Sequence, residues 1–567
     1  MLMSIVSQMA FRCSVMLALK LFIYHWEMNR KLLGAALTAI AAFLIFTVGI
    51  LIGRSLFSGS PSYDNTKLDA VMSLVREQYV DTVNDETLTD MAVTSLMRSL
   101  DPHSEYIPKK DLQAVNEDLD GSFSGVGISF QIVQDTVTVV EAITGGPAEK
   151  VGIMAGDRIL SANGKSLAGN GVSNEDVFKT LRGKKGTRVS LDILRPGSTK
   201  SQPFSLIRSD IPVNSVDAAY VMDDGLTGYI KLSKFTRNTY KEFLDAISKL
   251  DAEGAKRLIL DLRNNPGGYL DQAALIANEF LRPGSMIVYT KSRTPENKLE
   301  MTADGTGSHQ LTPLAVIINE YSASASEIIA GAIQDNDRGV IVGRRSFGKG
   351  LVQNQTMLPD SSAIRLTVAR YYTPSGRSIQ KEYKIGESST YELYILERYN
   401  RGEFYHLDSI RLDKTKAFRT ASGRIVYGGG GIMPDVFVPE DTTQITSWYM
   451  AVNNAGLIQQ HAFALADRYR PLMRGVKDTE QVLRILPADA RLVEQFAEFA
   501  ESKGVPARWY YINISAPLVA SQLKAFIVRD ILGYDSFFEI FNADDRTINI
   551  ARDVLEKGKL PTKTISR

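Results

Sequence analysis

Cysteine is nearly absent from this sequence and histidine is sparse, which excludes several kinds of active site. One of the 567 residues is a cysteine, Cys13, and five are histidines. With a single thiol near the start, the rest of the chain holds no disulfide framework, thiolate metal site or cysteine nucleophile. No two histidines lie within five positions of each other, so a zinc motif of the H-E-x-x-H kind is also absent.

A large net charge of either sign is lacking as well. The 65 basic residues nearly cancel the 64 acidic ones, so the chain has no global field to attract nucleic acid or acidic lipid. We expect no nucleic-acid partner, and local sites must carry the function. With 44% hydrophobic residues the chain is not disordered, and its length predicts about three or four domains.

The long uncharged run at residues 32–53 is a candidate membrane anchor. As a helix, its 22 positions span a hydrocarbon core about 30 Å thick. Arg30 and Lys31 come before it, and the positive-inside rule then keeps residues 1–31 in the cytoplasm and exports the remainder. A cleaved signal peptide is the alternative, although the run is longer than usual and no clear A-x-A site follows. We expect an uncleaved anchor, and Met28 is an alternative start of the protein.

Two different patterns follow the anchor. Within residues 65–116, positions 68–100 carry apolar side chains at helical spacing, and a break at 83–86 predicts two helices. From residue 117 to 210 the pattern changes to short β runs, glycine-rich turns and one helix. GVGISF, then GGPAEKVGIMAGDRILSANG, then the helix, is an order that resembles a PDZ domain of the arrangement found in bacterial proteases.

The PDZ resemblance gives the GVGI segment a role in peptide binding. Gly125, Val126, Gly127 and Ile128 would present backbone N–H groups to the terminal carboxylate of a peptide. The adjacent strand edge would pair with the extended peptide, and the glycines permit close backbone approach. Taken alone, GVGI is equally typical of an ordinary turn. With the segments that follow, it predicts a module that binds protein C-termini.

Residues 211–440 alternate between strand and helix patterns. Near-continuous apolar strands at 258–262 and 314–318 indicate a buried, largely parallel sheet. Active sites in such sheets gather where strands end and helices begin. Residues 441–567 are predicted to be mostly helical and hold no polar cluster that indicates chemistry. These helices fit packing on the preceding region, self-association or contact with an adaptor.

The segment IINEYSASASEIIAGAIQD predicts a strand, a turn of small residues and a helix. Small neighbours at Ala323 and Ala325 let the Ser324 hydroxyl protrude at the start of the helix. There, free N–H groups and the positive end of the helix dipole stabilise an oxyanion. The alternative is helix capping, because Ser324 and Glu327 fit the S-x-x-E capping box.

A second segment, GRRSFGKGLVQ, supplies Lys349 between two glycines, 25 positions after Ser324. A serine hydroxyl needs a base, and without a well-placed histidine a desolvated lysine can serve if burial lowers its pKa. Gln353 would lie on the same face if the segment were helical, and could hold the amine. The alternatives are a solvated surface turn or a phosphate loop, although G-x-x-x-x-G-K-[ST] fails because Gly350 follows the lysine.

A third segment, LILDLRNNPGGYLDQA, places a Pro-Gly-Gly turn between a strand and a helix. Together the three segments resemble the carboxy-terminal processing proteases, the tail-specific S41 serine peptidase family. SASASEI, FGKGLVQ and DLRNNPGG match its three core motifs in order and spacing. LDPHSEYI, the PDZ module and GGGIMPDVFVP are also typical of that family. The resemblance covers about residues 65–440.

The family resemblance assigns a role to each site residue. It implies that Ser324 is the nucleophile, Lys349 the general base and Gln353 the residue that orients the lysine. Gly268 and Ala325 would donate backbone N–H groups to the oxyanion. Asparagine and glycine at a strand end are also common turn formers, so the Gly268 turn alone indicates little.

The resemblance also implies an architecture and an activity. We expect an α/β catalytic core with crotonase- or ClpP-like strand–helix repeats, an inserted mainly-β PDZ domain, N-terminal helices and a C-terminal helical region. Arg182 resembles an arginine that couples peptide binding to the active site in some members. The implied protein is a serine endopeptidase, without metal or cofactor, that cuts exported proteins near their C-termini. We expect it in a bacterial inner membrane with its catalytic part in the periplasm. The expected divisions are a cytoplasmic extension (1–31), the anchor (32–53), a helical segment (65–116), the PDZ domain (117–210), the peptidase core (211–440) and a helical region of unknown role (441–567).

Three rival activities fit the sequence less well. A pseudoenzyme that binds peptide termini without cutting them has no need of intact Ser324, Lys349 and Gln353. A Ser–Lys acyltransferase or β-lactam-binding enzyme would want S-x-x-K and K-T-G, which do not accompany Ser324. A crotonase-type enzyme acting on thioesters also stabilises an oxyanion and shares the strand–helix repeats, but the PDZ module and the exported topology argue against it.

Overall fold

The computed structural model describes residues 66–558 apart from four single positions, together with a few positions nearer the start. The four are residues 134, 144, 170 and 387, and the earlier positions are residues 16, 19, 20, 23 and 44–47. Apart from those positions, the predicted extension (1–31) and anchor (32–53) lie outside the described residues. The chain divides into two compact units, Met1–Leu88 and Thr89–Arg567.

Two helices follow residue 65, as the spacing of apolar residues predicts. They are α2 (Thr66–Gln78) and α3 (Asp85–Leu100). The break between them covers residues 79–84, and Arg76 near the end of α2 forms an ion pair of 2.8 Å with Asp85 at the start of α3. The prediction of a helical pair is confirmed.

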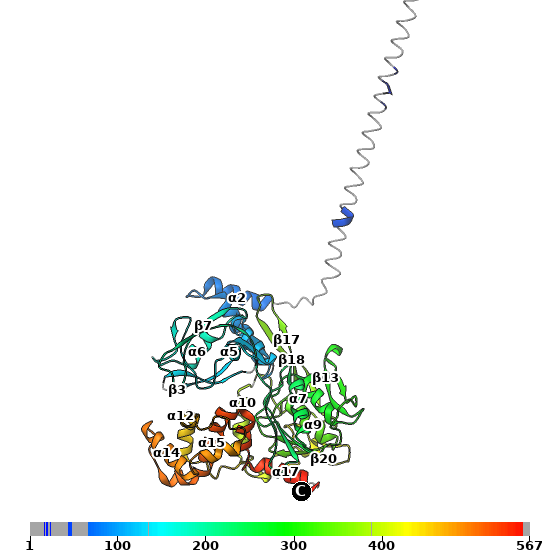
Figure 1. Ribbon diagram of the computed structural model, residues 1–567. Coiled ribbons are helices and arrows are strands. Elements are labelled where there is room, and N and C mark those ends of the chain that lie inside the picture. The colour runs from blue at the N-terminus through cyan, green and yellow to red at the C-terminus, as the bar shows by residue number, and fades with distance from the viewer. Residues whose placement is uncertain are drawn as a thin grey trace, which may run out of the picture. The chain divides into compact units, whose positions relative to one another are not determined.

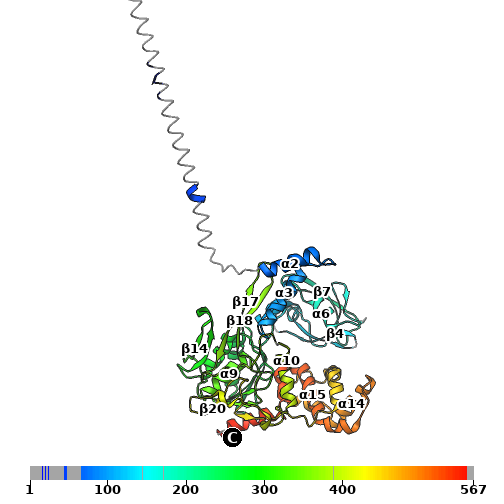
Figure 2. The same ribbon diagram turned by 180° about the vertical axis from the view of Figure 1, so that it is seen from behind.

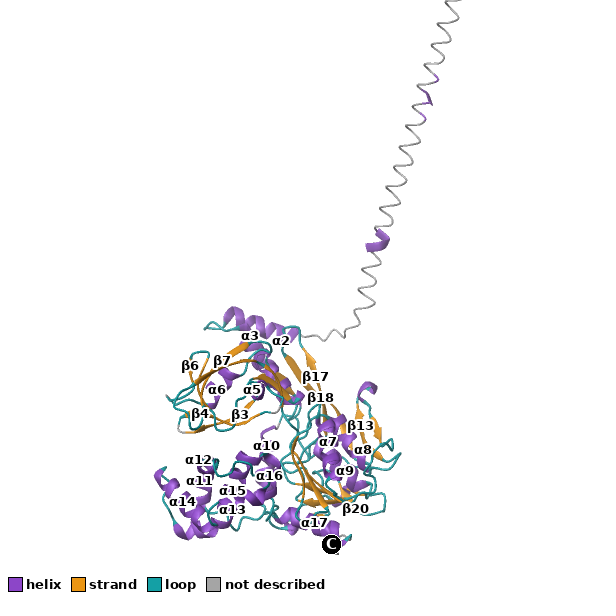
Figure 3. Cartoon of the chain, in the orientation of Figure 1, coloured by secondary structure: helices purple, strands orange, loops and turns teal. Residues whose placement is uncertain are grey.

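A β-rich module is built on one antiparallel sheet in the order β3-β4-β5-β7-β8, with β6 beside β5. Figure 3 shows these strands in orange, with helix α6 among them. The chain enters and leaves the module through a pair of antiparallel strands, β2 and β9. The elements are β2 (Ser122–Gly125), β3 (Ile128–Val133), β4 (Thr136–Ala142), α5 (Pro147–Lys150), β5 (Arg158–Ala162), β6 (Lys165–Ser166), α6 (Asn174–Leu181), β7 (Arg188–Leu194), β8 (Gln202–Ile207) and β9 (Ser209–Pro212).

The expected buried sheet has the order β10-β11-β12-β15-β16-β21. All neighbouring strands are parallel except β10 and β11, so the prediction of a largely parallel sheet is confirmed. The strands are β10 (Val216–Val221), β11 (Thr227–Leu232), β12 (Arg257–Asp261), β15 (Leu314–Ile318), β16 (Val340–Gly343) and β21 (Val436–Phe437).

Both faces of this sheet are covered, which explains its nearly continuous apolar strands. On β15, Val316 belongs to a core shared with the helices α7 (Thr239–Ala252), α8 (Leu270–Phe280) and α9 (Ala325–Asp335). The next residue, Ile317, belongs to a second core with Ile548 and Ala551 of α17 (Arg546–Lys557). Helix α17, red in Figure 1, therefore completes the core of the sheet.

A second, antiparallel sheet carries the residues that follow Lys349. Its order is β1-β18-β13-β14, and β17 also pairs with β18. Helix α4 (Lys109–Asp120) leads from β1 to β2. We call residues 344–350, between β16 and β17, the lysine loop. Because β17 begins two residues after Lys349, the β17–β18 pairing fixes where this loop ends. The strands are β1 (Glu105–Ile107), β13 (Met286–Ser292), β14 (Glu300–Thr302), β17 (Leu351–Met357) and β18 (Ala363–Tyr372).

A long connection joins β18 to β21, and we call residues 373–435 the β18–β21 connection. It contains helix α10 (Ser388–Asn400) and the paired strands β19 (Ala417–Arg419) and β20 (Ile425–Tyr427). Its side chains Lys381 and Arg398 are almost fully buried, and Arg398 donates to the carbonyls of Arg345 and Ser346, shortly before Lys349. The connection is therefore part of the core and not a surface excursion.

Helices α11 to α16 share a hydrophobic core of their own, and both views show them side by side (Figures 1 and 2). Within the part of the chain that the structure describes, α15 is the one helix long and apolar enough to cross a membrane. Val519, Leu523 and Ile527 of α15 are buried in this core, as in a core helix of a globular protein. The bounds are α11 (Ser447–Asn454), α12 (Leu457–Tyr469), α13 (Thr479–Ile485), α14 (Asp489–Ser502), α15 (Trp509–Leu532) and α16 (Tyr534–Phe541).

Candidate active site

Ser324 lies where β15 gives way to α9, at the N-cap of the helix. Its backbone has φ 55° and ψ −112°, whereas an ordinary N-cap is extended with negative φ. For a residue with a side chain this conformation is strained, by about 1–3 kcal/mol, and such strain clusters at functional sites. A residue selected only to cap a helix would not need it. The predicted capping box is also present, since the Glu327 carboxylate accepts a hydrogen bond from the Ser324 N–H. The strained backbone is an additional feature that capping does not require.

Glu327 joins the serine turn to the lysine loop. Its carboxylate is fully buried and accepts hydrogen bonds from the N–H of Ser324 (2.9 Å), Gly348 (2.7 Å) and Lys349 (2.8 Å). It also accepts from the hydroxyl of Ser346. Burial raises the pKa of Glu327 to about 7, although the four donors lower it. Sequence reasoning saw this residue only as part of a capping box, and missed that it spans two motifs.

Tyr371 of β18 makes a second bridge between the same two residues. Its hydroxyl donates to the carbonyl of Lys349 (2.6 Å) and lies 3.1 Å from the carbonyl of Ser324. Burial raises the pKa of Tyr371 well above 10, so the hydroxyl stays protonated and remains a donor. No local motif predicts this contact, because it depends on how β18 pairs with β17. The backbones of Ser324 and Lys349 thus share both a common acceptor and a common donor.

The surroundings of Lys349 favour a neutral amine. Burial lowers the pKa of Lys349 below its usual value of 10.5, and the positive charge of Arg365 adds to this effect. Within the described part of the chain, no carboxylate forms an ion pair with the Lys349 amine. No hydrogen bond joins this amine to the Ser324 hydroxyl there either. The structure brings the two residues together by their backbones and leaves the amine unpaired.

The condition that placed Gln353 on the same face as Lys349, a helical segment, is not met, because residues 351–357 form strand β17. The Gln353 amide donates to the backbone carbonyl of His103, in the LDPHSEYI motif. Burial, with a smaller effect of the Lys349 charge, lowers the pKa of the His103 ring to about 3, so the ring is neutral. Among the described residues, Gln353 has no hydrogen bond to the Lys349 amine.

The Pro-Gly-Gly turn lies directly against the serine. A Cβ at Gly268 would be 2.0 Å from the Phe235 carbonyl oxygen, and one at Gly267 would be 2.7 Å from the Cβ of Ser324. Both positions therefore require glycine. Within the described residues, neither the Gly268 N–H nor the Ala325 N–H has a hydrogen-bond acceptor. Both predicted oxyanion donors are thus available.

Gly267→Ala is expected to displace the serine turn. The new methyl group would collide with Ser324 and with the Ala323 carbonyl, 2.8 Å away, at a φ of 102°. We expect a loss of about 3 kcal/mol in the free energy of unfolding and at least a tenfold lower kcat. Gly284→Ala is the matched control, because φ is 77° there and nothing lies within 4 Å of the new Cβ. Peptide hydrolysis measures kcat and chemical unfolding measures the free energy of unfolding of both variants. Equal losses in Gly267→Ala and Gly284→Ala would contradict the predicted collision.

The predicted peptide-binding segment lies between β2 and β3. The carbonyls of Val126 and Gly127 accept hydrogen bonds from Ala148 and Ile143. Within the described residues, the N–H groups of Val126 and Gly127 have no acceptor. Strand β3, which begins at Ile128, lies at the edge of its sheet. Free N–H groups beside an open strand edge are what capture of a peptide terminus by strand addition requires.

Arg182 lies at the C-cap of α6 and is exposed. Its guanidinium lies 4.5 Å from the ring centroid of Phe123 and 4.8 Å from that of Phe178. Phe123 belongs to β2, one of the two strands through which the chain enters and leaves the module. Arg182 therefore contacts side chains of α6 and of a joining strand. Within the described part of the chain it has no hydrogen bond to Ser324 or Lys349.

Metal-ligating side chains do not gather in the described part of the chain. In the described residues, no group of three or more histidine, cysteine, aspartate or glutamate side chains could hold a metal ion. The site instead combines a strained serine, an unpaired amine and two free N–H groups at the ends of parallel strands. These are the components of covalent catalysis of acyl transfer.

Such a site on this fold defines a serine-type peptidase, and comparison with known proteins gives its family. Peptidase family S41 matches residues 226–387, a PDZ domain matches residues 138–195, and a family of unknown function matches residues 448–533. The chain belongs to family S41, among the carboxy-terminal processing proteases with a PDZ domain.

Two bacterial relatives agree with the family assignment. The carboxy-terminal-processing protease of Bartonella bacilliformis is 37% identical over 351 residues, which are 59% of this chain and 80% of that protein. The carboxy-terminal processing protease CtpA of Bacillus subtilis is 35% identical over 347 residues, 61% of this chain and 72% of that protein. Among solved structures, the photosystem II D1 C-terminal processing protease is 27% identical, with a TM-score of 0.35 and coverage of 66% of this chain and 87% of that chain.

Proposed function

We propose that this protein is a serine endopeptidase that uses Ser324 and Lys349 as a catalytic pair to cut exported proteins near their C-termini. The observation that carries the proposal is the double bridge between these residues. Glu327 accepts from both of their N–H groups, and Tyr371 lies within hydrogen-bonding distance of both of their carbonyls. Two such bridges fix one backbone against the other, as a nucleophile and its base require.

The chemistry follows from these positions. Neutral Lys349 takes the proton of the Ser324 hydroxyl, and the oxygen attacks the peptide carbonyl carbon. Gly268 and Ala325 donate their N–H groups to the resulting oxyanion. The lysine returns the proton to the leaving amine, which leaves an acyl-enzyme. Water, deprotonated by the lysine, then releases the acyl group and regenerates Ser324.

The PDZ module is proposed to select the substrate. Its free N–H groups at Val126 and Gly127 suit a terminal carboxylate, and the open edge of β3 suits an extended tail. Gln353 is proposed to orient the lysine in the active state. Arg182, stacked on Phe123 and Phe178, is proposed to transmit tail binding towards the catalytic site.

The setting of the enzyme is also part of the proposal. The uncharged run at 32–53 supports an anchor in a bacterial inner membrane, with the catalytic part in the periplasm. The repeated strand–helix order from β11 to β16 supports a core of crotonase or ClpP type. Helices α11 to α16 are proposed to contact an adaptor or a second copy, and exposed Trp509 and Tyr510 offer apolar surface for that.

Recognition of the tail carboxylate gives a direct test. A substrate protein with an unstructured apolar tail should be cleaved about 10- to 100-fold more efficiently, in kcat/KM, than the same protein with an amidated C-terminus. This is the value of one or two charge-assisted hydrogen bonds. A substrate that loses the same charge from an internal glutamate of the tail is the control.

Mass spectrometry of the products locates the cut, which should fall inside the tail. The inactive Ser324→Ala protein should retain the carboxylate-bearing tail in a pull-down and release the amidated one. Equal cleavage of both substrates would contradict tail selection by the PDZ module. Cleavage that continues in Ser324→Ala would contradict the assigned nucleophile.

A further inference from the structure

The loop that carries Lys349 is hydrogen-bonded to the β18–β21 connection on both sides of the lysine. The N–H of Lys381 donates to the carbonyl of Gly348 (3.0 Å). The side-chain oxygen of Gln380 accepts from the N–H of Gly350 (2.8 Å). Both glycines adjoin Lys349, so the connection grips the loop on either side of the proposed base.

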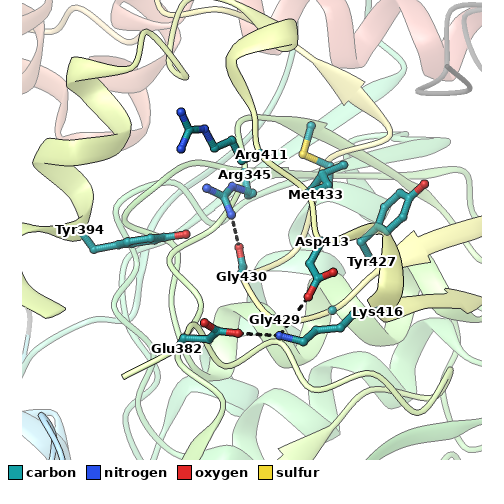
Figure 4. A pocket seen from close by; sticks show the side chains of 13 residues that line it. Arg345, Glu382, Tyr394, Arg411, Asp413, Lys416, Tyr427, Gly429, Gly430 and Met433 are labelled. Atoms are coloured by element: carbon teal, nitrogen blue, oxygen red, sulfur yellow. Dashed lines mark hydrogen bonds and ion pairs between the residues drawn. The ribbon is translucent and has the colours of Figure 1, made fainter. Parts of the chain in front are cut away.

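Two buried arginines extend this grip to the start of the loop. Arg398 of α10 donates to the carbonyls of Arg345 (2.6 Å) and Ser346 (2.9 Å). Arg345 makes two hydrogen bonds of 2.7 Å with Glu403 and one of 2.9 Å with the Gly430 carbonyl. Figure 4 shows the bond to Gly430 at the wall of a cavity of about 390 Å³. The loop therefore cannot shift unless the connection shifts with it.

Lys381 is the unusual member of this contact, because it is a buried cation in a cage of aromatic rings. Its side chain is 1% exposed. Nζ lies 3.8 Å from the ring centroid of Phe347, 3.7 Å from that of Tyr391 and 4.6 Å from that of Tyr394, which are cation–π distances. We call these three rings the aromatic cage. In the described part of the chain no carboxylate forms an ion pair with Lys381, and Nζ donates to the Tyr391 carbonyl (3.2 Å).

The aromatic cage reaches Lys349 from two directions. Phe347 belongs to the lysine loop, two residues before the base. Tyr391 belongs to α10, and its hydroxyl lies 2.8 Å from Nε2 of His103. The carbonyl of His103 in turn accepts from Gln353, the residue proposed to orient the lysine. The Lys381 ammonium thus contacts one ring in the lysine loop itself, Phe347, and a second ring, Tyr391, that is connected to Gln353 through His103.

We propose that Lys381 is a positioning residue for Lys349, whose caged ammonium fixes Phe347 and thereby the loop from which the base reaches Ser324. This inference rests on the proposed function of that pair. Packing alone does not call for a charge here, because an unpaired buried cation is costly and an apolar side chain would fill the space. Burial lowers the pKa of Lys381, which reflects that cost, and the three ring faces oppose this shift because they stabilise the charged form of the amine.

A double-mutant cycle on the full chain tests the contact. Lys381→Met keeps the length and apolar stem of the side chain and removes the charge, and Phe347→Leu removes the ring on the loop. Each single variant should lower kcat about tenfold, with KM and tail binding by the PDZ module unchanged. The double variant should also lose about tenfold, because both changes break one contact. Lys416→Met is the control, since Lys416 lies in the same connection but pairs with Glu382 and Asp413 at the surface, and it should retain the wild-type kcat.

Three results would overturn the inference. The first is a kcat of Lys381→Met within twofold of the wild type. The second is a kcat of the double variant that is a hundredfold lower than the wild type. The third is a higher KM with unchanged kcat in the single variants. If Lys381→Met does not fold, as judged by circular dichroism, Phe347→Leu alone decides by the same kcat and KM criteria. A wild-type activity that does not depend on Ser324 would overturn the proposed function itself. If wild-type cleavage depends on Ser324 but Lys381→Met is fully active, only this inference is overturned and the proposed function stands.

Discussion

Ser324→Ala is expected to lower kcat for a tail-bearing substrate by about 10⁴-fold or more, because no other group can take the place of a lost nucleophile. Binding of the tail should be unchanged, since the PDZ segment from Gly125 to Ile128 is separate from the serine turn in the sequence. Single-turnover assays with the protein in excess measure the loss, and fluorescence anisotropy of a labelled tail measures binding.

The strained backbone of Ser324 allows a sharper version of this experiment. Ser324→Gly removes the hydroxyl as well, but glycine accepts a φ of 55° without the strain that alanine retains. Ser324→Gly should therefore be as inactive as Ser324→Ala and about 0.5–1 kcal/mol more stable in chemical unfolding. Ser361→Ala is the matched control, because Ser361 also has a positive φ of 72° but is exposed in a loop. It should stay fully active, and a comparable loss there would contradict a specific role for Ser324.

Lys349→Met is expected to lower kcat by about 10³-fold or more, since the serine hydroxyl is a poor nucleophile without its base. Lys349→Arg should be equally inactive, because a guanidinium keeps its proton and cannot act as a base. This pair separates loss of the base from loss of the charge. Lys298→Met is the control, since Lys298 is an exposed lysine that pairs only with Glu300 within the described part of the chain.

The same lysine predicts the pH dependence of the reaction. The neutral amine accepts the proton of Ser324, so kcat/KM should rise as pH rises through the pKa of Lys349. Burial lowers that pKa below 10.5, and the midpoint of the rise should therefore lie below the pH at which an exposed lysine titrates. A pH profile of kcat/KM measures this. A profile that still rises with the pKa of a free lysine would contradict the role of the buried amine.

The same pKa shift predicts the effect of Lys349 on stability. Between the lowered folded pKa and 10.5 the unfolded chain binds more protons than the folded chain, so the contribution of this lysine to stability increases with pH. Below that window, folding must bury a charged amine, which opposes folding. Lys349→Met should therefore not lower the free energy of unfolding at neutral pH and should raise it if the site does not relax. Chemical unfolding at two pH values measures this, and a large destabilisation would contradict it.

Some features follow from local sequence because local physics decides them. The apolar strands 258–262 and 314–318 predict a buried sheet, and small residues around Ser324 predict a strand that turns sharply into a helix. The motif DLRNNPGG predicts a turn that needs glycine, and Gly267 and Gly268 indeed have no room for a Cβ. Nearby residues fix these features, so a single sequence contains enough information to predict them.

Other features could not be predicted because they depend on residues that are distant in the sequence. The sequence left open whether Gln353 lies on a helix, and pairing with β18 makes its segment a strand, because strand pairing depends on the partner. Tyr371 lies 22 residues after Lys349, and its hydroxyl reaches two backbone carbonyls only once β18 is in place. Glu327 has a capping signature, yet its other donors come from a loop about twenty residues away.

The sequence by itself therefore determined that Ser324 begins a helix, that Lys349 lies between two glycines and that cysteine and paired-histidine chemistry is absent. Tertiary structure decided that these two residues meet, because Glu327 and Tyr371 connect their backbones only after β15, β17 and β18 are assembled. It also decided that the β18–β21 connection, which carries no recognisable catalytic motif, packs its buried charges and rings against the lysine loop. Local chemistry is encoded residue by residue, whereas the distance between two motifs is a property of the folded chain.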